Sequence, residues 1–409
     1  MPADALEIRA VHEDELDAYR DCMQEVFGMD PAGDPDGATR LRTLLDRTRS
    51  YCAFDGARLV GTCATWSMQL AVCGGTVPMA GLTMVTVRAS HRRRGLLRRM
   101  IAAHLADARA HGEPLSGLWA SDAPIYGRYG YGVAAEGDEL TAGPDDGFAR
   151  GRTLDAVDVV SDREAARVLP AIYAAGCEQR PGSFARTEPW WRLRRFTDRP
   201  DQKRGRSPRR HAVATRGGAA TGYAVYRQQL AFDDGRPAGT VDVDELVALD
   251  PTAEASLWHH LTHLDLFPKV TWWNAPTDCL APLLTDDRRR VTRGRRADTL
   301  WLHLVDVPAA LAGRAYLADD QLVLAVRAPH TGEVSRWRLT AERGQATCVA
   351  TDAAPDLELD HPALAALYLG GTRPSLLAGT GALTGTAAAL ARADRLFDWP
   401  VAPWCAEIF

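Results

Sequence analysis

One stretch of the sequence decides its fold: Met84-Val-Thr-Val-Arg-Ala-Ser-His-Arg-Arg-Arg-Gly-Leu-Leu-Arg-Arg-Met100. The first residues of this stretch are apolar and β-branched, which predicts a strand. Apolar residues then recur at helical spacing from Leu96 to Leu105, which predicts a helix with Ser90 as a plausible N-cap. The strand and the helix are joined by the short basic turn Arg92–Gly95.

A strand that enters a helix through such a turn predicts an anion-binding site. Unpaired backbone N–H groups lie at the positive end of the helix dipole, and Gly95 allows a pyrophosphate to approach the backbone closely. The turn is neither a P-loop nor a G-x-G-x-x-G motif, because it has one glycine and no Lys-Ser/Thr. The alternative is an amphipathic helix with a solvated arginine face. The preceding strand and the matching segments described below favour the anion site.

The turn resembles motif A of the GNAT acetyltransferases, whose pattern is Arg/Gln-x-x-Gly-x-Gly/Ala. Arg92-Arg-Arg-Gly95-Leu-Leu97 fits that pattern, except that Leu97 replaces the final small residue. The resemblance implies that acetyl-CoA is the donor, with its pyrophosphate on the turn and its pantetheine along the preceding strand. The cofactor-binding residues expected from it are Met84, Val85, Thr86, Val87, Arg92, Arg93, Arg94, Gly95, Leu96, Leu97, Arg98 and Ser121.

A second informative stretch is Ser121-Asp-Ala-Pro-Ile-Tyr-Gly-Arg-Tyr-Gly-Tyr-Gly132. A free tyrosine has a pKa of about 10, so it is protonated at neutral pH and can act as an acid. Tyr126, Tyr129 and Tyr131 compete for this role, or all three pack as aromatics on a glycine-rich turn. The spacing closely resembles the Eis (enhanced intracellular survival) family, in which the first tyrosine protonates the departing thiolate. The resemblance therefore implies Tyr126.

The order of expected elements also resembles a GNAT domain over residues 1–145. A strand, two helices, a meander of strands, a helix and a strand follow one another, and Gln69–Val72 is expected as a separate strand. In the GNAT fold the fourth and fifth strands splay apart, and the pantetheine lies in the gap as an added strand would. The fifth strand is expected at Leu115–Ala120.

Residues 146–292 look like a second GNAT unit. Asp250-Pro-Thr-Ala-Glu-Ala stands where the first unit has its arginine-glycine turn, and two carboxylates without a glycine would repel a pyrophosphate. We therefore expect a non-binding copy. The basic tract 186–210 raises the alternative of RNA binding, but a solvated helix and loop are favoured in an acidic protein without RNA-binding signatures.

Residues 293–409 resemble the sterol-carrier-protein-2-like domain with which the Eis family ends. A charged connector is expected at Arg288–Arg296, followed by short strands, one of them at Arg314–Leu317, and then helices. The tail from Asp398 to Phe409 is apolar and aromatic, so we expect it to be docked. The Eis resemblance implies that the terminal carboxylate of Phe409 reaches the active site and acts as the base. The fold class is α/β (α+β).

Composition limits the other classes of function. A net charge of −5 argues against general nucleic-acid binding, and no stretch approaches the length of a transmembrane helix. No signal peptide is recognisable at the N-terminus, and the eight cysteines show no metal-ligand spacing. We expect a cytoplasmic protein with reduced thiols and no bound metal.

The Eis resemblance implies acetylation of primary amines, often at several positions of aminoglycosides, a chemistry associated with antibiotic resistance, by a homo-hexamer. A polycationic substrate requires acidic residues in its pocket, and the candidates are Asp21, Glu25, Asp34, Asp36 and Glu407. Apolar walls are expected from Phe27, Trp66 and Trp404. Two alternatives remain: a protein lysine acetyltransferase and a non-enzymatic lipid- or CoA-binding protein.

Overall fold

The computed structural model describes residues 6–409, which form two compact units. Unit 1 runs to Ala135 and also contains Pro181–Ala185 and Asp298–Phe409, whereas unit 2 contains Glu136–Arg180 and Arg186–Ala297. The expected domains 1–145, 146–292 and 293–409 are continuous in sequence, but these units are not. The expectation that no signal peptide is present depends partly on residues 1–5, which lie outside the described range. Within residues 6–409, no helix combines the length and apolar character needed to cross a bilayer.

The first sheet of unit 1 has the strand order β1-β2-β3-β4-β5-β14. Its strands are β1 (Leu6–Arg9), β2 (Cys52–Asp55), β3 (Arg58–Val72), β4 (Gly75–Val87), β5 (Leu115–Leu118) and β14 (Val291–Leu304). Two expectations are wrong here. Gln69–Val72 is the end of the long strand β3 and not a separate strand, and most of the expected charged connector at Arg288–Arg296 lies in β14.

The β3–β4 hairpin carries the irregularity that shapes the site. The pairing runs from Gly61↔Val87 to Val72↔Gly75, with a register shift between Thr62 and Ala64. Because Thr62 pairs with Thr86 and Ala64 pairs with Thr83, two residues of β4 oppose one residue of β3. Met84 and Val85 form this β-bulge, and Met84 adopts a φ of 53°, in the left-handed region that side chains disfavour.

Strands β4 and β5 pair in parallel over three positions only, from Met79↔Leu115 to Gly81↔Gly117. Beyond Gly81 and Gly117 the two strands separate, which confirms the predicted splay of the fourth and fifth strands.

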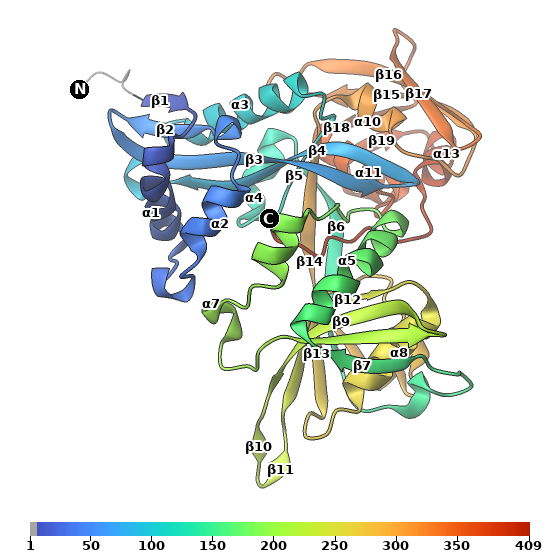
Figure 1. Ribbon diagram of the computed structural model, residues 1–409. Coiled ribbons are helices and arrows are strands. Elements are labelled where there is room, and N and C mark those ends of the chain that lie inside the picture. The colour runs from blue at the N-terminus through green and yellow to red at the C-terminus, as the bar shows by residue number, and fades with distance from the viewer. Residues whose placement is uncertain (1–5) are drawn as a thin grey trace. The chain divides into compact units, whose positions relative to one another are not determined.

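Helices cover both sides of this sheet (Figure 1). On one side lie α1 (Leu16–Phe27) and α2 (Gly37–Leu44), and on the other lies α3 (Leu96–Ala110). Helix α1 buries Leu16, Tyr19 and Cys22, and α3 buries Leu96, Met100, Ile101, His104 and Ala108. The prediction of Ser90 as N-cap is wrong. Gly95 is the N-cap residue of α3, and Ser90 lies in a short 3₁₀ turn ahead of it.

A short mid-chain segment, Pro181–Ala185, belongs to unit 1 and is called the strap below. The Ala71 N–H donates to the Ser183 carbonyl at 2.7 Å, and the Gly182 N–H donates to the Ala71 carbonyl at 2.9 Å. The Ala185 N–H donates to the Gln69 carbonyl at 3.0 Å, so the strap pairs with the end of β3.

The rest of unit 1 is a five-stranded sheet in the order β17-β16-β15-β18-β19, with short helices and the tail. The strands are β15 (Asp320–Arg327), β16 (Val334–Glu342), β17 (Gln345–Ala350), β18 (Leu357–Asp360) and β19 (Leu383–Gly385). The helices are α10 (Val307–Ala312), α11 (His361–Tyr368), α12 (Pro374–Thr380) and α13 (Ala387–Phe397). Arg314–Leu317, expected as a strand, is irregular chain after α10. The tail is docked as predicted, since Trp404 and Phe409 are buried and the Trp404 N–H donates to the Pro181 carbonyl at 2.8 Å.

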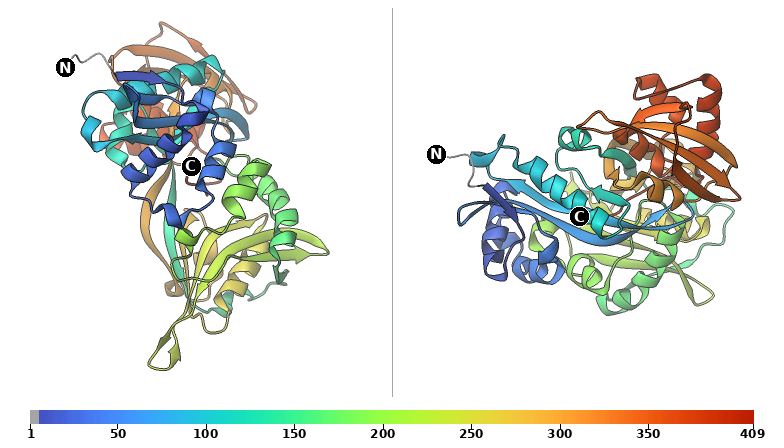
Figure 2. Two further views of the ribbon diagram at one scale, coloured as in Figure 1. Left: turned by 60° about the vertical axis from the view of Figure 1, so that its left-hand side comes forward. Right: turned by 90° about the horizontal axis from the view of Figure 1, so that it is seen from above.

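Unit 2 repeats the strand–helix plan of the first sheet. Its strand order is β6-β13-β12-β9-β8-β7, from β6 (Gly132–Ala142), β13 (Lys269–Pro276), β12 (Thr240–Ala248), β9 (Ala219–Gln229), β8 (Arg210–Arg216) and β7 (Ala156–Val160). Its long helices are α5 (Asp162–Gln179) and α8 (Pro251–Thr262), and the tract 186–210 holds short helical turns and loop. A register shift between Val243 and Glu245 repeats the bulge of β4. The small hairpin of β10 (Phe232–Asp233) and β11 (Arg236–Pro237) projects from this sheet (Figure 2).

Candidate active site

The basic turn before α3 is open to solvent and has the geometry of an anion site. Arg92, Arg93, Arg94 and Gly95 are exposed, and Arg93 and Gly95 have φ values of 63° and 76°. The first intrahelical hydrogen bond of α3 runs from the Arg99 N–H to the Gly95 carbonyl. The N–H groups from Arg93 to Arg98 therefore precede the hydrogen bonds of the helix. Donors at the positive end of the dipole, next to exposed guanidinium groups, are suited to a pyrophosphate.

His91 anchors this turn to the sheet. Its Nε2 lies 3.1 Å from Oδ2 of Asp55 at the end of β2, and its Nδ1 lies 2.8 Å from the Ser90 hydroxyl. The ring is buried, so these two contacts fix the chain immediately ahead of Arg92.

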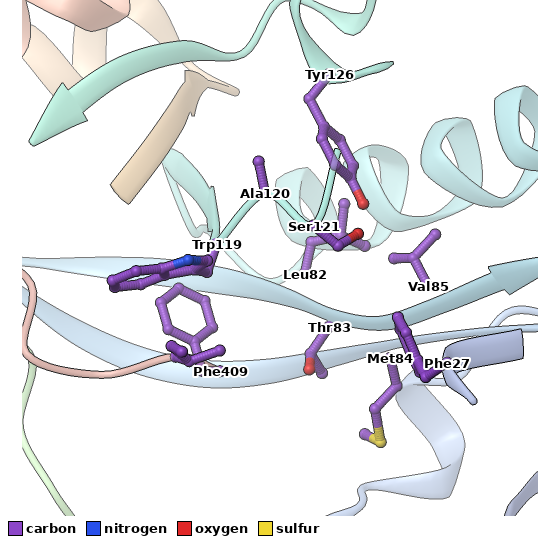
Figure 3. A pocket seen from close by; sticks show the side chains of 11 residues that line it. Phe27, Leu82, Thr83, Met84, Val85, Trp119, Ala120, Ser121, Tyr126 and Phe409 are labelled. Carbon is purple, nitrogen blue, oxygen red and sulfur yellow. The ribbon is translucent and has the colours of Figure 1, made fainter. Parts of the chain in front are cut away.

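A cavity of about 320 Å³ lies where β4 and β5 separate (Figure 3). Its lining comes from α1, from β4, from the segment that follows β5, and from the C-terminal tail. The lining residues are Phe27, Leu82, Thr83, Met84, Val85, Trp119, Ala120, Ser121, Tyr126, Ile408 and Phe409. Carboxylate side chains are absent from this set of described residues, and its character is mainly apolar and aromatic.

Tyr126 ends the short helix α4 (Ala123–Tyr126) and directs its hydroxyl toward Ser121 (Figure 3). Burial raises the pKa of its phenol to about 12, although interaction with the Ser121 hydroxyl acts in the opposite direction. The group is therefore a protonated donor at neutral pH.

The other two tyrosines of the glycine-rich turn are held elsewhere. Tyr129 packs edge-on against His330, with ring centroids 5.3 Å apart. The Tyr131 hydroxyl lies 2.7 Å from the Ser116 hydroxyl, which lies 2.7 Å from Nε2 of His104. Among the described residues, Tyr126 is the one tyrosine in the cavity lining.

His104 completes a buried chain of polar groups that includes Ser116 and Tyr131. Its Nδ1 lies 2.6 Å from the Thr65 hydroxyl, so both ring nitrogens contact hydroxyl groups. Burial lowers the pKa of His104 to about 3, so the ring is neutral and one nitrogen donates while the other accepts. This chain ties β3, α3 and β5 to Tyr131.

Phe409 reaches the cavity from the tail, and its ring lies next to Trp119 (Figure 3). It is 8% exposed and packs edge-on against Phe184 of the strap. A Cβ added at Gly81 would meet the Phe409 ring at 3.4 Å, so the ring lies directly on β4.

The expected cofactor residues separate into two groups. Met84, Val85 and Ser121 line the cavity, while Arg92–Arg98 form the turn and the first turn of α3. Thr86 and Val87 belong to neither group, because Thr86 is buried and Val87 ends β4, and neither is in the cavity lining. The structure thus brings the expected pantetheine strand to the cavity.

Of the expected substrate residues, Phe27 alone is in the cavity lining among the described residues. Glu25 forms an ion pair with Arg88, and Asp34 forms one with Arg40. Asp21 and Asp36 are exposed, Trp66 is half-buried on β3, and Trp404 and Glu407 are buried in the tail.

Sequence reasoning missed Leu82, Thr83, Trp119 and Ala120. A usable signal existed for these four residues. In a splayed pair of parallel strands, the residues after the last paired positions face the gap. Leu82 and Thr83 follow Gly81, and Trp119 and Ala120 come soon after Gly117.

Unit 2 has a carboxylate at the position that corresponds to the basic turn. The Asp250 side chain accepts hydrogen bonds from the N–H groups of Thr252 and Ala253, both at 2.9 Å, and caps α8. Arg216 and these N–H groups hold the pKa of Asp250 below its usual range. Glu254 is half-buried, desolvation raises the pKa of its carboxyl group, and it accepts a hydrogen bond from the Leu280 N–H at 2.8 Å. The N-terminus of α8 is already occupied by the chain's own anion.

Comparison with known families agrees with this geometry. Residues 7–134 and 182–305 each match an acetyltransferase (GNAT) domain, and residues 307–406 match a sterol carrier protein domain. An uncharacterized N-acetyltransferase of Streptomyces avermitilis is 37% identical over 97% of this chain and 98% of its own length. The N-acetyltransferase Eis of Mycobacterium bovis is 36% identical over 90% of this chain and 91% of its own length.

The chain belongs to the Eis family of GNAT N-acetyltransferases. The crystal structure of Eis1 from Mycobacterium abscessus supports this assignment, with a TM-score of 0.82 and 29% identity over 98% of this chain and all of that one. The predicted fold, tandem GNAT domains followed by a sterol-carrier-like domain, is confirmed. The protein is an acetyltransferase, and GNAT enzymes use acetyl-CoA as donor.

Proposed function

We propose that this Eis-family enzyme transfers an acetyl group directly from acetyl-CoA to a primary amine in the cavity between β4 and β5. The observation that carries the proposal is that Tyr126, Val85 and Phe409 line one cavity of about 320 Å³. These residues would supply an acid, an oxyanion donor and a base around one reacting centre.

The donor would bind with its pyrophosphate on Arg92–Gly95 and its pantetheine along β4, where β5 leaves the strand unpaired. The open N–H groups and exposed guanidinium groups of the turn fit a pyrophosphate, while the apolar bulge residues fit the pantetheine and thioester. Holding the thioester and the amine in one cavity makes the transfer effectively intramolecular, which accounts for a large part of the rate.

In the proposed reaction, the α-carboxylate of Phe409 takes a proton from the ammonium group of the acceptor. The free amine attacks the thioester carbonyl carbon, and the Val85 N–H stabilises the oxyanion that forms. As the carbon–sulfur bond breaks, the sulfur of CoA receives the Tyr126 proton. The nitrogen of the product loses its second proton to the Tyr126 phenolate, which restores the acid, and the Phe409 carboxyl group releases its proton to solvent. An α-carboxylate with a pKa of about 3.5 is ionised at neutral pH and attracts an ammonium group.

For the acceptor we propose an aminoglycoside, with acetylation possible at several amines and resistance to the antibiotic as the consequence. Its polycationic body would meet acidic side chains outside the mainly apolar cavity, while one amine enters. A lysine side chain is the second candidate, because it also presents a primary amine on an apolar stem that fits an apolar cavity. We further propose cytoplasmic homo-hexamers, which size-exclusion chromatography with light scattering would test.

The deciding experiment is an acetyl-CoA turnover assay against a panel of aminoglycosides and a lysine-containing peptide, with mass spectrometry to count acetyl groups on each product. Turnover with aminoglycosides supports the first candidate, and turnover with the peptide alone supports the second. CoA binding by calorimetry without turnover on any amine would contradict the proposal and favour a non-enzymatic CoA-binding protein.

A further inference from the structure

Two buried threonines lie next to the β-bulge of β4, and one of them contacts its backbone. Thr62 on β3 and Thr86 on β4 are 0% and 3% exposed. The Thr62 hydroxyl lies 2.6 Å from the Met84 carbonyl and 2.6 Å from the Thr86 hydroxyl. The Thr62 N–H donates to the Thr86 hydroxyl oxygen at 3.3 Å.

The direction of each hydrogen bond in this cluster follows from counting protons. A carbonyl oxygen can only accept, so the single hydroxyl proton of Thr62 goes to the Met84 carbonyl. The short contact between the two hydroxyls then requires Thr86 to donate to Thr62. The Thr86 oxygen still accepts from the Thr62 N–H, and Cys22 of α1 lies 3.6 Å away.

This arrangement sets the orientation of one peptide plane. The Met84 carbonyl and the Val85 N–H belong to the same planar trans peptide, because the described residues contain no cis bond. In a trans peptide the C=O and N–H groups point in opposite directions. Holding the Met84 carbonyl against the Thr62 hydroxyl therefore aims the Val85 N–H away from Thr62, and Val85 lines the cavity.

The orientation has to be maintained against strain. Met84 has a φ of 53°, in the left-handed region that a non-glycine residue adopts only with strain. Such a conformation persists only where surrounding contacts hold it. The hydrogen bond from Thr62 to the Met84 carbonyl is a contact of this kind at the strained residue itself.

We infer that Thr62 and Thr86 are positioning residues for acetyl transfer, because they hold the Val85 N–H in the orientation that stabilises the oxyanion. The inference rests on the proposed role of the Val85 N–H. Neither threonine touches the substrate, since Thr62 acts through Met84 and Thr86 acts through Thr62. The effect is therefore graded: loss of the Thr62 hydroxyl frees the peptide, whereas loss of the Thr86 hydroxyl leaves the bond to Met84 in place.

The test compares Thr62→Val, Thr86→Val and Thr62→Ser at saturating acetyl-CoA and amine. Removing one oxyanion donor typically lowers kcat by about 10²–10³-fold. In Thr62→Val the Val85 N–H remains but has the wrong orientation, so kcat should fall by roughly tenfold to a hundredfold. The kcat of Thr86→Val should fall only a few-fold. The kcat of Thr62→Ser, which keeps the hydroxyl, should stay within about threefold of the wild-type value. The affinity for CoA, which lacks the acetyl carbonyl, should be unchanged in all three.

Thr262→Val is the matched control. Thr262 in α8 is 1% exposed, and its hydroxyl donates to the Trp258 carbonyl at 2.8 Å, so the same substitution removes the same kind of buried bond. It should lower the melting temperature without changing kcat. An equal kcat for Thr62→Val and wild type, or an equal loss in Thr262→Val, would overturn the inference.

A crystal structure of Thr62→Val provides a readout that does not depend on turnover. The expected result is a Met84–Val85 peptide that has rotated, with Met84 outside the left-handed region. An unchanged peptide would contradict the inference even if the rate fell. If Thr62→Val does not fold, the other two variants decide. Wild-type kcat in Thr62→Ser together with a more than tenfold lower kcat in Thr86→Val would contradict the inference. Absence of any acetyl transfer by the wild-type enzyme would instead contradict the proposed function.

Discussion

The ring of Phe184 stands edge-on to the ring of Phe409, with centroids 5.5 Å apart and an interplanar angle of 80°. Phe184 lies in the strap, which is bonded to β3, and Phe409 lies in the cavity lining. The strap contacts the tail at a second point, because the Trp404 N–H donates to the Pro181 carbonyl. The chains also pack closely at Gly182, where an added Cβ would lie 3.0 Å from backbone atoms of Trp404. The strap thus fixes the last residues of the tail relative to β4.

Phe184→Leu should lower kcat by roughly tenfold, because small displacements of a reacting group reduce rates steeply. The substitution removes an aromatic pair worth about 0.5–1.5 kcal/mol but keeps an apolar side chain of similar reach. Steady-state kinetics and calorimetry with CoA would measure the effect, and CoA affinity should not change. Phe148→Leu is the control, since Phe148 is also fully buried and stacks on Trp258 in unit 2. A comparable loss of kcat in both variants would show that the effect is one of stability.

The proposed base makes a separate prediction that distinguishes the terminal carboxylate from the ring. Phe409→Leu keeps a carboxylate at the same position and should retain part of the activity. Several residues appended after Phe409 should nearly abolish turnover while CoA binding remains, because the carboxylate is displaced from the cavity. The same residues appended at the N-terminus are the control. A C-terminally extended enzyme with normal kcat would exclude the carboxylate and make Glu407 the next candidate.

Gly95→Asp should weaken CoA binding by more than an order of magnitude, because it places a negative charge beside the proposed pyrophosphate site. Gly112→Asp provides a matched control at the other end of α3. Gly112 has a φ of 66°, close to the 76° of Gly95, and a Cβ there would meet no atom within 4 Å. Both variants should lose about 1–2 kcal/mol of stability from left-handed strain. Calorimetry should show weaker CoA binding in Gly95→Asp only, and equal affinities would refute the site.

Tyr126→Phe should lower kcat by roughly a hundredfold or more, as expected for loss of a general acid. Tyr131→Phe removes the hydroxyl bonded to Ser116 and should cost about 1 kcal/mol of stability with little change in rate. Because burial raises the pKa of Tyr126 to about 12, the acid stays protonated, so it should cause no alkaline loss of kcat up to about pH 10. An alkaline limb below that pH that disappears in Tyr126→Phe would contradict this assignment.

Asp250→Ala should reduce the free energy of unfolding by about 1 kcal/mol, the usual value of an N-cap. The folded-state pKa of Asp250 is lowered, so its stabilisation is present above the unfolded pKa of about 3.9 and is lost as pH falls through the folded value. The difference between wild type and variant, measured by denaturant titration, should therefore shrink in acid. Calorimetry should give one CoA per chain for both proteins. A stoichiometry of two would show that unit 2 also binds the cofactor.

Sequence patterns predicted those parts of the fold that depend on local chemistry. The run from Met84 to Met100 specified a strand, a turn and a helix because β-branched residues, a glycine with positive φ and helical periodicity each act over a few residues. The glycine-rich turn left Tyr126, Tyr129 and Tyr131 open as the acid, and the resemblance to the Eis family implied Tyr126. Ser90 failed as N-cap because Gly95, in the left-handed conformation, starts the helix after an additional turn of chain.

Contacts between distant parts of the chain could not be predicted in this way. Charges at Arg288–Arg296 indicated a connector, yet this segment enters a strand whose arginines pair with Asp138. The acidic side chains chosen as substrate ligands were selected by charge alone, and Glu25 and Asp34 form ion pairs with arginines. Pairing partners such as Arg88 and Arg40 are set by tertiary structure, which composition and periodicity do not encode.

The pairing of β14 with β5 has a consequence for how the chain folds during synthesis. Leu118 lies opposite Trp301, so the outer edge of β5 receives its partner only after most of the chain has been made. Until then the ribosome has released a nearly complete first sheet with an unpaired edge, the feature that most readily recruits another chain. Long-range closure of this kind also raises contact order and slows folding. Successful production of the enzyme therefore depends on protecting the β5 edge until Trp301–Leu304 emerges, and a chaperone that covers this edge during that interval should raise the yield of active protein.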